Sequence, residues 1–323
     1  LRRILLMIPV LLGVVFIVFT INHFGPGDPV AALLGGNYTQ EQYDAKEKEL
    51  GLDQPFAVQF VNYVKGIVTE FDLGTSYQSK RPVSTEILER FPTTLVLGLL
   101  GVLLTVIVGI PFGIISATKQ YSILDYVVTI ISLIFASIPS FWMAMMMQLG
   151  LSYNLGWFPA TYAAGSAISM VLPVLTLGLS PVATVTRITR SSMLDVIRQD
   201  YIRTARAKGL SERQVIWKHA LKNALIPVIT VVGMQIGMIM AGSVVVEAIF
   251  SIPGLGSLLM SAINNKNYPV IQGSVLFMSI FISAMNLLVD LVYGFVDPRI
   301  KAQYGTKKAS KKADEETAKG EVA

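Results

Sequence analysis

The chain contains no cysteine, only two histidines and few charged residues. Without cysteine it has no disulfide framework, no thiolate-bound zinc or iron–sulfur cluster and no thiol nucleophile. Charged residues make up 15% of its 323 residues, whereas a soluble chain averages about 25%. The histidines, His23 and His219, lie too far apart in the sequence to indicate a metal site. The charge deficit excludes a soluble globular enzyme, a disordered chain and a free nucleic-acid binder.

Apolar residues dominate instead, at 53% of the chain and a mean hydropathy of +0.58. Residues 91–186 include only two Asp, Glu, Lys or Arg residues, and residues 223–296 include only three. A helix needs about 20 apolar residues to cross about 30 Å of hydrocarbon with its backbone amides satisfied. Six stretches meet this requirement, so we expect an all-α polytopic membrane protein with six transmembrane helices near residues 4–24, 93–117, 124–149, 168–186, 224–249 and 270–296.

Basic residues gather in the segments on one side of these spans. They are Arg2 and Arg3, Lys119, nine residues within 187–223, and those in the tail after residue 296. Short cytoplasmic loops are enriched in Lys and Arg, so both termini are predicted to be cytoplasmic. A basic start followed by an apolar run is also typical of a cleaved signal peptide. Here the run is longer than a signal core, which favours a retained first helix at 1–24.

Residues 25–92 are too long for a connecting turn and are predicted to form an extracytoplasmic cap. Thr39 and Gln42 have the spacing of a capping box, and Gly51 suits the position that ends such a helix. A second cap helix is expected after Asp53, with an apolar stripe of Phe56, Phe60, Val64 and Ile67. This stripe either packs on the tops of the spans or docks an external partner.

Residues 187–223 are predicted to form a basic helix–turn–helix, with nine basic and three acidic residues. Residues 193–208 read as one helix, Gly209 as its left-handed stop, and 211–214 as the capping box of a second helix ending near 222. Three interpretations compete: a DNA-binding motif, a loop on anionic headgroups, or a docking lever for a cytoplasmic machine. A unit tethered to the bilayer at both ends is unsuited to a major groove, so we expect no nucleic-acid partner.

This segment resembles the EAA loop of permease subunits in bacterial ABC importers, whose pattern is E-A-A-x3-G-x9-I-x-L-P. Ala205, Gly209 and Leu221 match the pattern. The positions of Glu, the first Ala, Ile and Pro are occupied by Arg203, Thr204, His219 and Lys222. The block 201–227 is similar to the peptide-importer version of the loop, in which those departures are usual.

Further segments resemble, in the same order, the B-type permease subunit of oligopeptide and dipeptide importers. They are residues 26–29, 50–55, 72–77, 89–94, 247–256 and 297–299. The likeness covers about residues 1–302 and implies the type I permease fold, with a permease core at 93–302. The tail, 303–323, is rich in Lys, Glu and Ala and is predicted to be disordered.

The resemblance implies half of a translocation pathway in a bacterial cytoplasmic membrane. The implied partners are a C-type permease, two cytoplasmic ATPases, an extracytoplasmic peptide-binding protein, the peptide and membrane lipid. The chain has no G-x4-G-K-[ST] phosphate loop, so it is not expected to be an enzyme, and ATP and Mg²⁺ are assigned to the partner ATPases. Oligopeptides are the expected substrate; dipeptides, nickel and glycans are the family alternatives.

Two sets of residues are candidates for function. For ATPase coupling we expect Ala205 and Gly209 to let the two helices approach, with Leu210, Trp217 and His219 contacting the ATPase. Arg203, Thr204 and Leu221 complete this set. Candidates for the pathway or its gating are the polar residues of the last two spans, Gln235, Ser243, Glu247, Asn286 and Asp290.

Two alternatives from other classes fit the sequence less well. An intramembrane hydrolase needs a Ser–His, paired-Asp or metal constellation at membrane depth, which the sequence does not provide. A stand-alone secondary transporter leaves the docking lever unexplained. For Asp290 we expect a structural pairing with Arg187 or Arg190, and for Glu247 either gating or orientation of the cap.

Overall fold

The computed structural model describes residues 2–296, in which every regular element is helical apart from an isolated bridge between Thr75 and Pro82. Residues 297–323, with the predicted disordered tail and the 297–299 motif, lie outside the described part. The elements are α1 (Arg2–Phe24), α2 (Pro29–Leu34), α3 (Gln40–Glu49), α4 (Phe56–Glu70), α5 (Val83–Thr118), α6 (Ile123–Ser137), α7 (Ser140–Met147), η1 (Gln148–Asn154), η2 (Ala167–Met170), α8 (Val171–Ile197), α9 (Asp200–Ala207), α10 (Glu212–Gln214), η3 (Val215–Ala220), α11 (Leu221–Ile249), α12 (Leu255–Asn264) and α13 (Tyr268–Val296).

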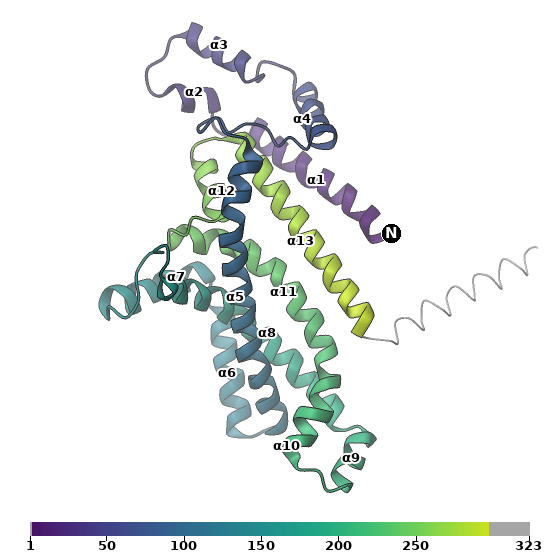
Figure 1. Ribbon diagram of the computed structural model, residues 1–323. Helices are drawn as coiled ribbons and strands as arrows, with labels where there is room; N and C mark the ends of the chain where they lie inside the picture. Colours follow the sequence, from purple (N-terminus) through teal and green to yellow (C-terminus); the bar gives the residue numbers. More distant parts are fainter. Residues whose placement is uncertain (1, 297–323) are drawn as a thin grey trace, which may run out of the picture.

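Within residues 2–296, five helical stretches are long and apolar enough to cross a membrane, and a bent pair raises the number to six if it counts as one span. The straight ones contain α1, α5, α8, α11 and α13. The cap elements α2 to α4 lie at one end of the molecule, whereas α9 and α10 lie at the other, as Figure 1 shows. The predicted all-α fold with multiple spans is therefore confirmed.

The centre of the bundle is the close pair α5 and α8. A Cβ atom added at Gly113 would lie 2.4 Å from Cβ of Thr189, and one at Gly109 would lie 2.9 Å from Cβ of Val185. The Thr105 hydroxyl donates a hydrogen bond to the carbonyl oxygen of α8's Gly178 at 2.7 Å. Small residues let membrane helices approach in this way, where van der Waals packing and interhelical hydrogen bonds replace the hydrophobic effect.

The third predicted span, 124–149, is wrong as a single straight helix. Helix α6 ends at Ser137, and the following segment is bent by 98° relative to it. Pro139 explains the break because its ring disfavours a helical conformation in the preceding residue. Ile138 is accordingly extended, with φ −85° and ψ 122°. The segment α7–η1 therefore leaves the bundle sideways (Figure 1).

The boundaries predicted for the basic helix–turn–helix also need correction. The expected helix at 193–208 is two helices, because α8 continues to Ile197 and α9 begins at Asp200. The second helix does not end near residue 222, since Glu212–Ile249 is one continuous helical stretch. The second helix of the basic helix–turn–helix and the fifth predicted span are thus parts of one helix.

The cap helices follow the predicted signals. Thr39 and Gln42 form the expected capping box, and Gly51 adopts a φ of +68°. The apolar stripe of α4 packs on α1, where the ring of Phe60 lies 5.5 Å from Phe16 and 5.4 Å from Phe19. Of the two interpretations of the stripe, packing on a span is the one that the structure supports for these aromatic residues.

Candidate functional site

The helix–turn–helix is held against the bundle by a shared apolar core. Ile202 and Ala205 of α9 and Val215 of η3 are buried. They pack on the end of α5 and on the last turns of α8, together with Ile114, Ala117, Met193, Ile216, Ala220 and Ala224. This helix–turn–helix (α9, α10 and η3, residues 200–220), called the lever below, therefore shares one apolar core with the ends of α5 and α8.

The turn between the two helices depends on Gly209. Its φ of +78° is a left-handed conformation that glycine adopts without strain. A Cβ atom at this position would meet nothing within 4 Å, so the prediction that Gly209 allows close helix approach is wrong. Ala205 is 7% exposed and does lie in the packed face.

Polar contacts fix the second helix after the turn. Ser211 and Gln214 form the predicted capping box. Arg206 donates to both carboxylate oxygens of Glu212, at 3.1 Å and 2.7 Å, which bridges the turn. The Asn223 side chain donates to the hydroxyl of Tyr201 at 2.7 Å. The lever is therefore a preformed element.

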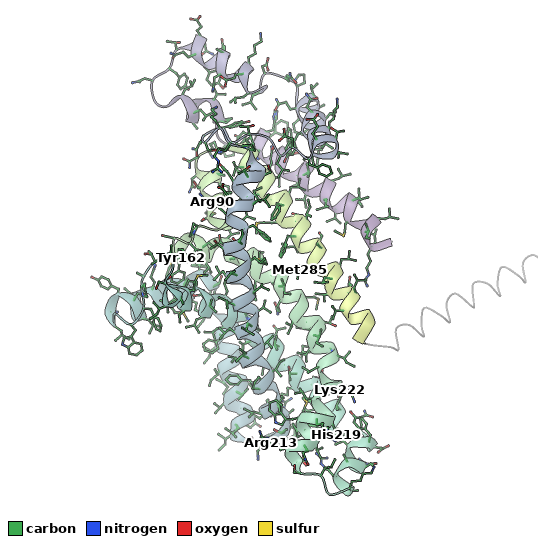
Figure 2. The ribbon with its side chains drawn as sticks, viewed as in Figure 1. Arg90, Tyr162, Arg213, His219, Lys222 and Met285 are labelled. Carbon is green, nitrogen blue, oxygen red and sulfur yellow. The ribbon has the colours of Figure 1, made fainter. Side chains whose placement is uncertain are left out.

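The outward face of the lever carries most of the predicted coupling residues. Arg203 and Thr204 are exposed, and Trp217 is 52% exposed. Leu210, His219 and Leu221 are half-buried at its edge. Figure 2 shows Arg213, His219 and Lys222 at the end of the molecule opposite the cap. An exposed indole is suited to docking a protein partner, because tryptophan is enriched in protein–protein interfaces.

A second constellation lies at the other end of α11, around Glu247. This residue is 0% exposed, and its Oε2 accepts a hydrogen bond from the Ser257 amide at 3.1 Å. The Leu255 amide donates to the hydroxyl oxygen of Thr94, on α5, at 2.7 Å. Two side chains from different helices thus cap the first amides of α12, whose N-terminus lacks a side-chain cap of its own.

The same geometry explains why glycine occupies positions 254 and 256. A Cβ atom at Gly254 would lie 2.3 Å from Oε2 of Glu247, and one at Gly256 would lie 2.9 Å from it. Among the described residues, no donor reaches the other oxygen, Oε1. Glu247 is therefore placed to orient α12, and its predicted role in gating stays a prediction.

Asp290 forms an ion pair with Arg3 of α1. The predicted pairing of Asp290 with Arg187 or Arg190 is therefore wrong. The physical reason is the helix order: α13 packs beside α1, whereas Arg190 faces α6 and pairs with Asp125. Together with Asn286, Arg3 and Asp290 line a groove of about 290 Å³ between α1 and α13.

The five pathway candidates do not gather in one place. Ser243 is buried on α11, one turn before Glu247. Gln235 is half-buried on the same helix, nearer its start. Asn286 is exposed in the α1–α13 groove. No single site on this chain unites them, and their role in a pathway remains a prediction.

Sequence reasoning missed the buried pair of Asp125 and Arg190. Asp125 is 4% exposed and also accepts hydrogen bonds from the Ser116 hydroxyl and, at 3.0 Å, from the Tyr121 amide. A signal was present, since Asp125 is one of only two charged residues within 91–186. A buried carboxylate requires a partner, and Arg190 supplies it.

Known families and relatives match most of the chain. Residues 109–302 match the family described as "Binding-protein-dependent transport system inner membrane component", and residues 1–98 match its N-terminal counterpart. The dipeptide transport system permease protein DppB of Alkalihalophilus pseudofirmus is 41% identical, with 93% of this chain and 98% of that protein covered. The oligopeptide transport system permease protein AppB of Bacillus subtilis is also 41% identical, with the same coverage. DppB of Escherichia coli K12 is 39% identical, again with the same coverage.

Solved structures show a similar fold. A chain of the inward-facing MetNI methionine ABC transporter superposes with a TM-score of 0.57 and 18% identity, covering 66% of this chain and 97% of that chain. A chain of an amino acid ABC transporter superposes with a TM-score of 0.51 and 14% identity, covering 65% of this chain and 94% of that chain. At these identities the likeness concerns the fold.

Proposed function

The chain belongs to the family of binding-protein-dependent transport system inner membrane components, and from this premise we propose that it forms half of a peptide-import pathway. It is a multi-pass permease of the bacterial plasma membrane and not a catalytic subunit. In such an importer, ATP and Mg²⁺ bind to separate ATPase subunits. The further partners are a C-type permease and an extracytoplasmic receptor that delivers the peptide.

The observation that carries the proposal is the preformed lever at the end opposite the cap. A ligand shifts a conformational equilibrium only through contacts that differ between the states. ATP binds elsewhere, so its effect must reach the permease through a docking surface. The exposed face of Trp217, Arg203 and Thr204 provides that surface, and its buried side is part of the core of α5 and α8. We propose the orientation in which the lever, and with it both termini, lies in the cytoplasm.

The substrate class comes from the relatives, which are named for peptides. One relative at 41% identity is a dipeptide permease and another at 41% is an oligopeptide permease, so these are the two candidate substrates. We propose oligopeptides. Binding of peptides of graded length to the cognate receptor separates the two.

The test is reconstitution of the purified importer in proteoliposomes with its receptor outside and ATP inside. Accumulation of labelled peptide is expected only with ATP and with all subunits present. Accumulation by this chain alone, without ATP, would instead identify a secondary transporter. No accumulation of any peptide by an ATP-hydrolysing complex would refute the proposed substrate class.

A further inference from the structure

A cavity of about 570 Å³ lies within the extracytoplasmic cap. The top of α1, helices α2 to α4 and the start of α13 form its walls. Its volume falls within the range of about 300–1,000 Å³ typical of small-molecule sites. None of the functional residues discussed above belongs to it, so it needs a separate explanation.

The walls of the cavity are tied together across long sequence distances. The Tyr268 hydroxyl donates to the carbonyl oxygen of Gly27 at 3.1 Å. The side chain of Asn267 accepts from the Tyr77 amide at 3.0 Å and donates to the Ser76 hydroxyl at 2.9 Å. On the opposite wall, α4 is fixed to α1 by the aromatic contacts of Phe60. The cavity is thus preformed, which lowers the entropic cost of binding.

The lining is acidic. Two carboxylates, Asp28 and Glu47, and one imidazole, His23, line the cavity, and no Lys or Arg is among the described residues that line it. Lys266 lies outside the lining, and its ammonium donates to the carbonyl oxygen of Pro26 at 3.1 Å. Oδ1 of Asp28 accepts from two backbone amides of α2, at 2.8 Å and 3.0 Å. Glu47 is half-buried, and no hydrogen bond or ion pair from another described residue occupies its carboxylate, which leaves it available to a ligand.

Four tyrosines complete the lining: Tyr43, Tyr63, Tyr77 and Tyr268. A hydrogen bond to Asp28 raises the pKa of Tyr43 to about 12, so this hydroxyl stays neutral. Aromatic faces attract organic cations by about 0.5–2 kcal/mol, and more strongly when the site is partly dehydrated. Carboxylates and aromatic rings together suit an alkylammonium ion, and the lack of a lining Lys or Arg among the described residues disfavours a carboxylate ligand.

The geometry points to a binding site for the protonated amino terminus of a peptide, with Glu47 as the counter-charge and the tyrosines around the ammonium group. This inference rests on the proposed import of peptides and adds a recognition step on the permease itself. The peptide meets this site on the extracytoplasmic side, after it leaves the receptor.

The experiment uses the complete importer in lipid nanodiscs without its receptor, titrated by calorimetry. The probes are trialanine and N-acetyltrialanine, which differ by the ammonium group. Trialanine is expected to bind, and N-acetyltrialanine to bind at least about tenfold more weakly, because the charge interaction is lost. Glu47→Gln keeps the shape of the side chain but removes its charge, so it should weaken the binding of trialanine about tenfold. Glu41→Gln, an exposed change on the same helix α3, should leave binding unchanged.

Equal binding of the two probes, or of trialanine to wild type and Glu47→Gln, would overturn the inference. The absence of trialanine binding in the millimolar range would do the same. In a parallel titration of the receptor into the same nanodiscs, docking weakened by Glu47→Gln without any trialanine binding would overturn the inference and assign the cavity to a cationic side chain of the receptor. ATP-driven uptake of trialanine with the receptor present tests the proposed function separately, so the two failures are distinguishable.

Discussion

Arg190 of α8 donates two hydrogen bonds to the carboxylate of Asp125 at the start of α6, at 3.0 Å and 2.8 Å. The same carboxylate accepts from Ser116 near the end of α5. One buried acid therefore joins three helices a few turns before the lever begins. None of the described residues of the lever core lies on α6, so the carboxylate of Asp125 is a polar link that ties α6 to α5 and α8 beside that core.

Removal of Arg190 should strongly destabilise the chain. Arg190→Ala leaves the buried carboxylate of Asp125 unpaired, and breaking such a pair costs about 3 kcal/mol. Thermal unfolding of the purified complex should show a clear decrease in Tm. Arg187→Ala is the matched control, since Arg187 is exposed on the same helix. Equal Tm values for the two variants would contradict the role of the pair.

The pair of Arg3 and Asp290 should contribute much less. Its side chains are 58% and 39% exposed near the predicted cytoplasmic ends of α1 and α13, and ion pairs that water reaches contribute about 0–1 kcal/mol. A double-mutant cycle with Arg3→Ala and Asp290→Ala should therefore give a coupling energy below about 1 kcal/mol. A coupling of several kcal/mol would show that α1 and α13 depend on this contact.

Gly254 should not tolerate a side chain. In Gly254→Ala the new Cβ atom would lie 2.3 Å from Oε2 of Glu247 and 2.6 Å from the Thr94 hydroxyl, so α12 must shift. Overpacking of this kind costs about 1–3 kcal/mol. Gly150→Ala is the control because its Cβ would meet nothing within 4 Å. Unfolding curves that coincide for the two variants would rule out the proposed tie between Glu247 and α12.

Position 209 should require a residue that tolerates a left-handed backbone conformation, whether or not its side chain is small. At a φ of +78°, valine is strained, whereas asparagine tolerates this conformation. Gly209→Val is expected to lose most peptide-stimulated ATP hydrolysis and uptake, while Gly209→Asn keeps most of both. The measurement is the ratio of peptide imported to ATP hydrolysed in proteoliposomes. Full coupling in the valine variant would remove Gly209 from the account.

Much of the fold could be predicted because membrane crossing and helix capping are local rules. The apolar stretches located the spans, and Thr39, Ser211 and Gly209 marked helix ends correctly. The break at Pro139 was also visible locally, but a proline in a membrane helix causes either a kink or a turn, and tertiary packing decides. No helix-ending residue separates η3 from α11, so the two continue as one helical stretch.

Contacts between distant helices could not be predicted in this way. Asp290 has several cations within reach along the sequence, and only the order of helices around α13 selects Arg3. The capping of α12 by Thr94 depends on α5, which lies far earlier in the chain. Sequence patterns identify the polar groups that need partners, but the packing of the helices determines which partners they have.

The exposed face of the lever is proposed to dock the ATPase, and Trp217 is the largest apolar side chain exposed on that face. Trp217→Ala removes an indole that is 52% exposed, and Trp157→Ala, at a residue 63% exposed on another part of the chain, is the control. The measurement is the affinity of the purified ATPase subunits for the permease pair in nanodiscs. Loss of such an interface tryptophan typically costs about 2 kcal/mol or more, so at least about tenfold weaker binding is expected for Trp217→Ala alone. Unchanged ATPase affinity and unchanged peptide uptake in Trp217→Ala would contradict the account.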